Sequence, residues 1–358
     1  MATIKQIAKL AGVSIGTVDR VLHERGGLDP NTKARVQAAI EELGYVPNQT
    51  AQSLAVYKKR LHILCIIIES PISPFFHAVN KAIRRKADSL NQAGVRVTLV
   101  NIMDLLGVVS VDGGQRSETA VGLMQDQFLQ LLDDVNAVVY PNVAYSLGEW
   151  GTEIFKQRNL PWICYNSGSE DEGMLAFVGA DYEKSGRIAM GLTALLAGIH
   201  ANVLVLSIGI DCTESYMKRM QGYCREGKKK YPGIRIADIL EIPIESEKQE
   251  EILKNTFEAH PEIDMVYIIN PADYAICDRI RNLEKSGCVR NNIPIITYDL
   301  TEESSERLKN GSITAVVTQQ PEVQGELALD LMYKYLVFGE IPEKVYYTKQ
   351  EIYIEQNV

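Results

Sequence analysis

Residues 3–22 read TIKQIAKLAGVSIGTVDRVL, and this stretch holds two short helical patterns separated by a turn. Thr3 and Gln6 have the spacing of a capping box, in which each side chain bonds the backbone of the other residue. Apolar residues then recur at three- and four-residue spacing until Gly12, which can take the left-handed conformation that ends a helix. Ser14 is a good N-cap for a second helix. The stretch therefore predicts a helix-turn-helix unit, and any small helical hairpin is the alternative.

A third helical pattern, between residues 29 and 44, decides between these alternatives. Asp29 supplies an N-cap, and Pro30 stands at the first helical position, where its missing N–H is not needed. Apolar residues follow at helical spacing until Gly44 ends the pattern. Three helices in so short a segment can enclose a small core. The beginning of the chain therefore predicts a helix-turn-helix domain.

Residues 45–60 predict a linker that contains one short helix. Pro47 forbids continuation of the preceding helix, and Asn48 can cap a new one. The alanine-rich helix over 48–55 has little apolar area to bury and is too short to be stable alone. We therefore expect this helix to be ordered only against a partner.

Taken together, residues 3–55 resemble, without gaps, the DNA-binding head of the lactose-repressor (LacI) family of bacterial transcription regulators. The resemblance implies that the second helix enters the major groove of DNA, with Ile15, Gly16 and Arg20 at base-reading positions. It also implies that the linker helix pairs with that of a dimer mate in the minor groove, where Leu54 inserts into a base step. The implied DNA-binding residues are Thr3, Ser14, Ile15, Gly16, Thr17, Arg20, His23, Asn48, Ala51 and Leu54.

The head departs from the family pattern at two kinds of position. Asp19 and Asp29 stand where the family usually has Ser, and each places a negative charge near phosphates. Ile15 and Gly16 offer almost no hydrogen-bonding chemistry, so we expect direct readout by this helix to depend on Arg20.

Charge is distributed unevenly along the chain. The 358 residues carry a formal net charge of -9, yet residues 1–60 hold nine Lys and Arg against five Asp and Glu. A basic head on an acidic body indicates that only the head meets a polyanion. Chance fluctuation is the alternative for so small an excess, so the motif and not the charge carries the prediction of DNA binding.

From residue 61 onward, β-rich apolar runs alternate with helical patterns such as 76–93 and 321–338. The expected strands are 61–69, 95–103, 135–140, 160–165, 203–209, 235–243, 263–269, 293–298, 313–318 and 351–356. This alternation predicts an α/β fold, with a small all-α head followed by a two-lobed, doubly wound body built on parallel sheets. A long loop is expected over 108–122. In such sheets a ligand binds at the carboxyl ends of the strands.

Residues 61 to about 353 resemble, more loosely, the periplasmic-binding-protein type I effector domain, whose two lobes close on a small polar molecule. The motifs that carry the resemblance include SPFF (73–76), SYMKRMQGY (215–223) and VTQQP (317–321). The implied effector-binding residues are Phe75, Phe76, Asn166, Asp181, Arg219, Asn270, Asp273, Asp299 and Gln320. An aromatic face at Phe75 can stack on a sugar ring, whereas a core aromatic pair is the alternative for Phe76. Arg219 is the best candidate to fork onto a ligand hydroxyl or carboxylate.

Other features argue against several classes of protein. The start of the chain has no apolar segment of signal-peptide length, and the longest apolar run, 61–68, is too short to span a bilayer. Six cysteines lie scattered without a CxxC pair, which is typical of reduced thiols, so we expect a cytoplasmic protein with no membrane partner. No GxGxxG follows a strand and the histidines never take metal-ligand spacing. We therefore expect no cofactor and no metal.

The sequence predicts three parts: a DNA-binding domain (1–47), a hinge helix and linker (48–60), and an effector-binding and dimerisation domain (61–358). We expect a homodimer that binds double-stranded operator DNA as a repressor. A small polar effector is expected to control it; a sugar or polyol is favoured, and a nucleobase or organic acid is the alternative. A solute-binding protein of a transporter and an enzyme are the competing functions. The head argues against the first, and the lack of a nucleophile–base set argues against the second, so no catalysis is expected.

Overall fold

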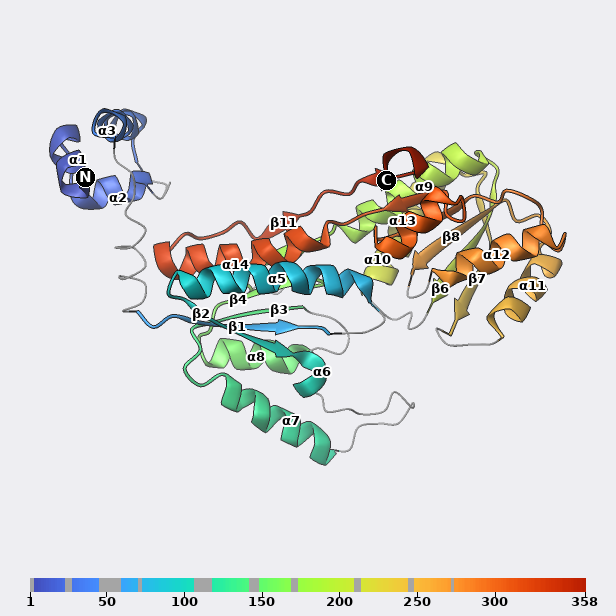
Figure 1. Ribbon diagram of the computed structural model, residues 1–358, viewed down its shortest axis with the longest axis horizontal. Helices are drawn as coiled ribbons and strands as arrows, with labels where there is room; N and C mark the ends of the chain where they lie inside the picture. Colours follow the sequence, from blue (N-terminus) through green and yellow to red (C-terminus); the bar gives the residue numbers. More distant parts are fainter. Residues whose placement is uncertain are drawn as a thin grey trace.

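The computed structural model describes residues 3–22, 28–44, 59–69, 73–105, 118–141, 148–168, 173–208, 214–243, 248–271 and 274–358. These residues form a small helical head and two α/β lobes (Figure 1). Each lobe contains a six-stranded sheet with buried apolar clusters on both of its faces. The predicted fold class is therefore confirmed.

The head contains the helices α1 (Ile4–Ala11), α2 (Ile15–Leu22) and α3 (Pro30–Glu42). One side chain from each helix, Ile7, Val18 and Val36, is fully buried in a single small cluster. Each helix is too short to be stable alone, so this shared apolar contact is what holds the three together.

The predicted helix starts in the head are confirmed. The backbone N–H of Thr3 donates to Gln6 Oε1 at 2.8 Å, and that of Gln6 donates to Thr3 Oγ1 at 3.3 Å, which completes the capping box. Ser14 Oγ accepts a hydrogen bond from the backbone N–H of Thr17 at 3.1 Å. The Asp29 carboxylate accepts from two backbone N–H groups in the first turn of α3. Because capping fixes where a helix begins, it fixes the turn between α1 and α2.

The N-terminal lobe has the strand order β11-β5-β4-β3-β1-β2, and every pair is parallel. Its strands are β1 (His62–Ile67), β2 (Arg96–Asn101), β3 (Ala137–Pro141), β4 (Trp162–Asn166), β5 (Ala176–Gly179) and β11 (Val345–Tyr347). Its helices are α5 (Pro74–Gln92), α6 (Ile102–Leu105), α7 (Glu118–Leu131), α8 (Gly148–Gln157) and α14 (Pro321–Phe338). Helices α5 and α14 lie side by side on one face, and α7 and α8 supply Phe128 and Phe155 to the cluster on the other (Figure 1).

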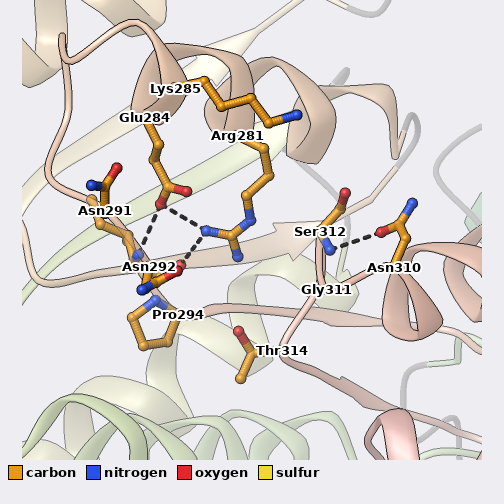
Figure 2. A pocket seen from close by; sticks show the side chains of 11 residues that line it. Arg281, Glu284, Lys285, Asn291, Asn292, Pro294, Asn310, Gly311, Ser312 and Thr314 are labelled. Carbon is orange, nitrogen blue, oxygen red and sulfur yellow. Dashed lines mark hydrogen bonds and ion pairs between the residues drawn. The ribbon is translucent and has the colours of Figure 1, made fainter.

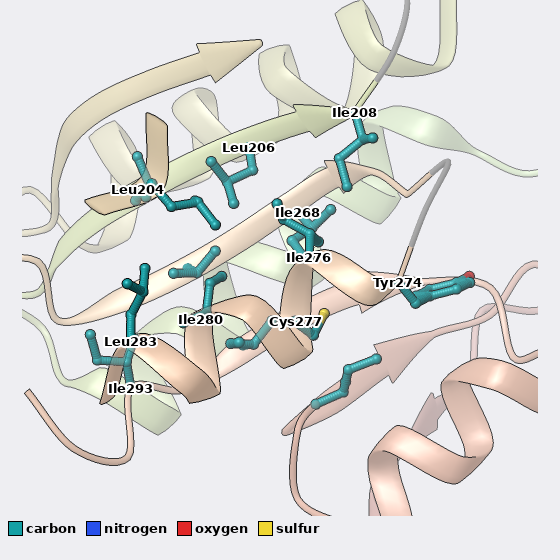
Figure 3. Close-up of a cluster of buried hydrophobic side chains, with 14 of the residues drawn as sticks. Leu204, Leu206, Ile208, Ile268, Tyr274, Ile276, Cys277, Ile280, Leu283 and Ile293 are labelled. Atoms are coloured by element: carbon teal, nitrogen blue, oxygen red, sulfur yellow. The ribbon is translucent and has the colours of Figure 1, made fainter. Parts of the chain in front are cut away.

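The C-terminal lobe repeats this plan with the order β12-β10-β9-β8-β6-β7. Its strands are β6 (Asn202–Ile208), β7 (Arg235–Ile242), β8 (Met265–Asn270), β9 (Ile295–Tyr298), β10 (Ala315–Val317) and the antiparallel β12 (Ile352–Tyr353). Its helices are α9 (Tyr182–Ala197), α10 (Glu214–Lys230), α11 (Gln249–Ala259), α12 (Ala275–Lys285) and α13 (Glu302–Lys309), with a final 3-10 turn (Glu355–Asn357). Figure 3 shows Leu204, Leu206 and Ile268 of this sheet packed against Ile276 and Ile280 of α12.

Most expected strands are present, with ends that differ by at most two residues. Two differences are larger. Only Ile352 and Tyr353 of the expected strand 351–356 pair with a neighbour, because the chain then turns into a 3-10 helix. Residues 118–122, expected in a loop, begin α7. The short strands β5 and β11 were not predicted from the sequence.

The chain crosses between the lobes three times, and the three crossing segments are hydrogen-bonded to one another. They follow β5, β10 and β11. The backbone N–H of Thr348 donates to the carbonyl of Gly179 at 2.9 Å, and that of Thr318 donates to Glu351 at 2.8 Å. The Gln350 amide donates to the carbonyl of Asp181 at 2.7 Å. Because β5 and β10 both lead into crossings at their carboxyl ends, the carboxyl ends of the two sheets face the same gap between the lobes.

Helices α9 and α10 cross with their backbones in contact. A Cβ atom on Gly186 would lie 1.9 Å from the carbonyl oxygen of Arg219, and one on Gly222 would lie 1.9 Å from that of Glu183. Only glycine allows this approach. It joins α9, which begins at the first crossing, to α10, so the two helices move as a unit.

Gly222→Ala is expected to destabilise the protein by about 1–3 kcal/mol or more, because the added methyl group would overlap backbone that cannot move aside. Gly191→Ala on α9 is the matched control. Nothing lies within 4 Å of its Cβ position, so it should stabilise by about 0.5–1 kcal/mol through helix propensity. Urea denaturation followed by circular dichroism measures both. An unchanged urea midpoint for Gly222→Ala would contradict the close crossing.

Candidate DNA-binding surface and effector site

Helix α2 has one buried face and one exposed face. Val18 and Val21 are buried in the head core. Ile15 keeps 49% of its surface exposed although it is apolar, and Gly16 and Arg20 are also exposed. An exposed isoleucine beside an exposed arginine is suited to contact a thymine methyl group and a guanine edge in the major groove.

The remaining DNA-binding candidates divide into two groups. Thr3, Ser14 and Thr17 lie at helix starts and are engaged in capping, and the hydroxyls of Ser14 and Thr17 are 2.9 Å apart. Ser and Thr hydroxyls can also bond phosphates. The other candidates lie outside the described residues: His23, Asn48, Ala51 and Leu54.

Asp29 keeps its negative charge at the base of the head. The Thr32 hydroxyl and two backbone N–H groups donate to its carboxylate and lower its pKa below the ordinary value. The capping role predicted for Asp29 is therefore confirmed, and the charge that accompanies it is permanent at neutral pH.

Two of the predicted effector residues occupy equivalent places in the two lobes. Asn166 ends β4 and Asp299 follows β9, the third strand in the order of each sheet. Both have a left-handed backbone with φ of 66°. Asn and Asp tolerate this conformation better than other residues with side chains, yet it remains uncommon and gathers at functional sites. It turns both residues sharply at the carboxyl end of their sheet, where a ligand is expected.

Arg219 is a buried cation, with only 3% of its surface exposed. Its guanidinium lies 3.7 Å from the centre of the Tyr298 ring and 5.2 Å from that of Tyr182. Nη1 donates to the carbonyl of Ile269 at 3.0 Å. Nε has no hydrogen-bond partner among the described residues. A buried charged donor without a partner indicates a position that a ligand oxygen can fill.

Asp299 lies close to this cation. Gln319 Nε2 donates to Asp299 Oδ1 at 2.7 Å. The residue as a whole is half-buried, but its carboxyl group is enclosed, and this burial raises its pKa above the ordinary value. The charge of Arg219 and the hydrogen bond from Gln319 lower the pKa of Asp299, but the effect of burial is larger. The lobe therefore holds an enclosed carboxylate beside a buried cation, a combination that can accept from and donate to ligand hydroxyls.

At the crossings, two predicted effector residues are hydrogen-bonded within the protein, and one residue that was not predicted bonds Asp299. Gln320 Oε1 accepts from the backbone N–H of Lys349 at 3.1 Å, and Asp181 caps α9 by accepting from Lys184. Gln320 was predicted as an effector residue, but its neighbour Gln319 is the buried glutamine that donates a hydrogen bond to Asp299. Alternation along β10 could have found it, because residue 319 has the same parity as Val317, which faces the tyrosines of this lobe.

Hydrogen bonds join Asn166 to residues that follow two of the crossings, the one after β5 and the one after β10. The Tyr182 hydroxyl donates to its carbonyl at 3.0 Å, and Gln324 Oε1 accepts weakly from its amide at 3.5 Å. Gln324, fully buried on α14, also donates to the carbonyl of Gln319 at 2.8 Å. The end of β4 is therefore joined to the lobe opposite it.

The other candidates lie at the same end of the lobes. Phe75 and Phe76 form an edge-to-face pair with ring centres 5.2 Å apart, and both are half-buried against the two clusters of the N-terminal lobe. Asn270 ends β8, is half-buried and pairs in register with Ser207. Asp273 lies outside the described residues.

Several enclosed polar atoms at this end of the lobes have no hydrogen-bond partner among the described residues. They are Asn80 Oδ1, Ser207 Oγ, Arg219 Nε, Gln319 Oε1 and Gln350 Oε1. Folded proteins leave few buried polar atoms unpaired, because each costs about 1–3 kcal/mol. A set that includes both donors and acceptors indicates a ligand rich in hydroxyl groups.

A pocket of about 650 Å³ lies elsewhere, at the amino ends of β9 and β10 (Figure 2). Its most buried charges are paired with each other, since Arg281 Nη1 bonds Glu284 Oε1 at 2.7 Å and the backbone of Ile293 bonds both residues. Strand amino ends are not where doubly wound sheets bind ligands. This pocket is therefore distinct from the expected effector site.

Over the ranges that the structure describes, no three His, Cys, Asp or Glu side chains gather in a way that could hold a metal ion. Within the same ranges, no helix combines the length and the apolar character needed to cross a membrane.

Comparison with known proteins gives two family matches. Residues 65–340 match the periplasmic binding protein domain, and residues 3–48 match the bacterial regulatory proteins of the lacI family. The ribose operon repressor of Bacillus subtilis (strain 168) is 39% identical over 101 residues, which cover 28% of this chain and 29% of that protein. The HTH-type transcriptional repressor PurR of Yersinia pestis (strain Pestoides F) is 33% identical over 157 residues, which cover 42% of this chain and 44% of that protein. The matches thus span less than half of these curated relatives.

A crystal structure from Bacteroides fragilis, described as a LacI transcriptional regulator, superposes with a TM-score of 0.68 at 18% identity. The match covers 83% of this chain and 98% of that one. At this identity the likeness concerns the fold.

Asp299→Asn should stabilise the ligand-free protein at neutral pH. A carboxyl whose folded pKa is raised contributes stability at low pH and loses it as the pH rises through the folded value, and Asn mimics the protonated form. The variant should therefore melt above wild type at about pH 7, and the difference should shrink as the pH falls toward about 4. Thermal melts at both pH values measure this.

Asp133→Asn is the control for Asp299→Asn. Asp133 is exposed and pairs with Arg158 at 3.3 Å, and such surface pairs contribute little. A lower melting temperature for Asp299→Asn at pH 7 would show that the attraction between ionised Asp299 and Arg219 outweighs the cost of burial.

Proposed function

Because the chain belongs to the periplasmic binding protein domain family and carries the head of the lacI family of bacterial regulatory proteins, we propose that it is a transcription repressor controlled by a small polar effector. One observation carries the proposal. The exposed face of α2 presents Ile15 and Arg20 in the same chain as a two-lobed body whose crossings enclose unpaired polar atoms. The relatives reported above are transcriptional regulators, and the proposal assigns no reaction to the chain.

For the effector we propose a sugar or polyol. Arg219, Asp299 and Gln319 together offer charged donors and acceptors, which suit a ligand whose hydroxyls can do both. The half-buried Phe75 and Phe76 offer aromatic surface from the other lobe. The name of the ribose operon repressor makes D-ribose a suitable first probe. A nucleobase or an organic acid remains the second candidate.

For the division of the chain we propose a head of residues 1–47, a hinge of 48–60 and a body of 61–358. The end of α3 at Glu42 and the start of β1 at His62 support it. In this proposal the 48–55 helix forms when two copies meet on the operator, with Leu54 inserted between base pairs. The protein would act in the cytoplasm, where DNA and effector meet.

A homodimer is part of the proposal, and the edge strands support it. In the C-terminal lobe β7 is an edge strand, and Ile239 on it keeps 49% of its surface exposed. Long edge strands with exposed apolar residues are seldom left uncovered in solution. A second copy of the chain would cover this edge and bring two heads to one pseudo-palindromic operator.

The function is tested by gel shift with the DNA upstream of the protein's own gene, with and without D-ribose, myo-inositol or adenine. Retention of this DNA over random DNA, altered by one of the three compounds, is the expected result. A thermal-shift assay measures effector binding separately, since a ligand at 100 times its Kd stabilises by about 2.7 kcal/mol. Equal retention of both DNAs would contradict the proposal.

Arg20→Ala should weaken binding to the specific operator by about 1–3 kcal/mol and binding to random DNA much less, because Arg20 is assigned to a base edge. Lys33→Ala, which removes an exposed cation from α3, is the charge-matched control. Fluorescence anisotropy at fixed salt measures both. Equal losses on the two DNAs would show that Arg20 only contacts phosphate.

Ile239→Lys should shift the protein toward monomer, because it places a charge on the edge that the second copy would cover. Ile341→Lys is the control, since Ile341 is 83% exposed but belongs to no strand. Size-exclusion chromatography with light scattering distinguishes them. A dimer that survives Ile239→Lys undiminished would place the interface elsewhere.

A further inference from the structure

The last residue of β9, Tyr298, lies directly under the buried cation of the effector site. Its ring is 1% exposed and faces the side of the sheet that α9 and α10 cover. The guanidinium of Arg219 lies 3.7 Å from the ring centre, which is stacking distance. Tyr298 is followed by Asp299, so one strand end supplies both the surface under the cation and the carboxylate beside it.

The Tyr298 ring is held in place by other tyrosines. Its hydroxyl lies 2.8 Å from that of Tyr267 and donates to the carbonyl of Ser185 at 3.3 Å. The Tyr267 ring is stacked on Tyr223 with centres 4.7 Å apart and planes within 24°. The Tyr223 hydroxyl lies 3.0 Å from Thr193 Oγ1 on α9. The row therefore links Tyr298 through Tyr267 to Tyr223 and α9, and Tyr298 is its member under the guanidinium.

Arg219 has few other restraints. Nη1 bonds the carbonyl of Ile269, and Asp299 and the ring of Tyr182 lie nearby. Among the described residues, none of these contacts engages Nε. A flat aromatic face can orient a planar guanidinium, because the two groups stack.

We propose that Tyr298 is a positioning residue, whose ring holds the Arg219 guanidinium in the ligand-free protein so that Nε is presented to a ligand oxygen. This inference rests on the proposed function, because it assigns a purpose to the orientation of Arg219. The positioned Nε donates in one direction, so it selects ligands with a hydroxyl or carboxylate oxygen at that point. In this role the aromatic ring of Tyr298 orients Arg219, whereas its phenolic hydroxyl only helps to hold the ring in place.

The variants separate the ring from the hydroxyl. Tyr298→Phe keeps the ring and removes both hydroxyl contacts, whereas Tyr298→Leu and Tyr298→Met remove the ring and keep an apolar side chain. Tyr223→Leu is the matched control, because it removes a fully buried tyrosine of the same row that does not contact Arg219. Tyr298→Met is the second variant if Tyr298→Leu does not fold.

The first measurement needs no effector. A proton above an aromatic ring resonates upfield, so the Nε–H signal of Arg219 in ¹⁵N-arginine-labelled protein reports the stack, and Arg219→Lys identifies it. The upfield position should persist in Tyr298→Phe and Tyr223→Leu and disappear in Tyr298→Leu or Tyr298→Met. An Arg219 signal that stays at its wild-type position without the ring would overturn the proposal.

The second measurement is the Kd for D-ribose by calorimetry. Tyr298→Phe should change it by less than about twofold, and the ring-deleted variants should weaken it by about tenfold or more, the size of a buried cation–π contact. Equal weakening by Tyr223→Leu and Tyr298→Leu would show a packing role and overturn the proposal. If wild type does not bind D-ribose, the sugar assignment fails, while the Arg219 signal still decides the role of Tyr298.

Discussion

The architecture depends on the hydrogen bonds that join the three crossing segments. Thr348 to Gly179 and Thr318 to Glu351 make these segments a short sheet-like joint between the lobes. Once the chain is tied there, the carboxyl ends of both sheets must face the same gap. Residues from distant parts of the chain, such as Asn166 and Asp299, thereby lie at strand ends that face this gap, without any pairing between their own strands. In the proposed regulator, a change in the angle between the lobes would occur at this joint.

The site formed there is costly for the fold. A buried cation, an enclosed carboxylate with a raised pKa, and left-handed backbone at Asn166, Asp299 and Gln320 all lower the stability of the free protein. The C-terminal lobe offsets this with a large apolar core and the glycine contact between α9 and α10. Left-handed backbone also occurs elsewhere, at Asp134, Asn159 and Asn292, but among the described residues only at this end does it accompany a buried cation and an enclosed carboxylate. Such a combination is typical of a binding site, because a ligand can supply the bonds that the fold omits.

The sequence predicted the parts of this structure that follow from local rules. Helix capping at Thr3, Ser14 and Asp29 can be predicted from neighbouring residues alone. The same holds for the long apolar strands. The short β11 could not be read in this way, because its only partner strand among the described residues, β5, lies far back in the chain. The site was predicted in outline only, through resemblance. Gln319 and Tyr298 were missed because their roles depend on what lies across the sheet, which no local pattern reveals.

In the proposed regulator, the free energy needed to couple effector binding to DNA binding can be compared with the free energy of the hydrogen bonds to the effector. Moving an equilibrium from 1:99 to 99:1 requires about 5.5 kcal/mol of differential binding. Hydrogen bonds to charged groups contribute about 1.5–3 kcal/mol each, so about two to four bonds made only in the closed state suffice. Arg219 and Asp299 belong to one lobe, whereas Phe75 and Asn166 belong to the other, so a bridging ligand gains part of its bonds only on closure. Helix α14 begins at the Gln320 crossing, and the carbonyl of Val337 near its other end accepts from Lys59 Nζ at 3.2 Å, where the linker enters the body. In the proposed regulator, a change at the crossing would therefore reach the linker through one helix.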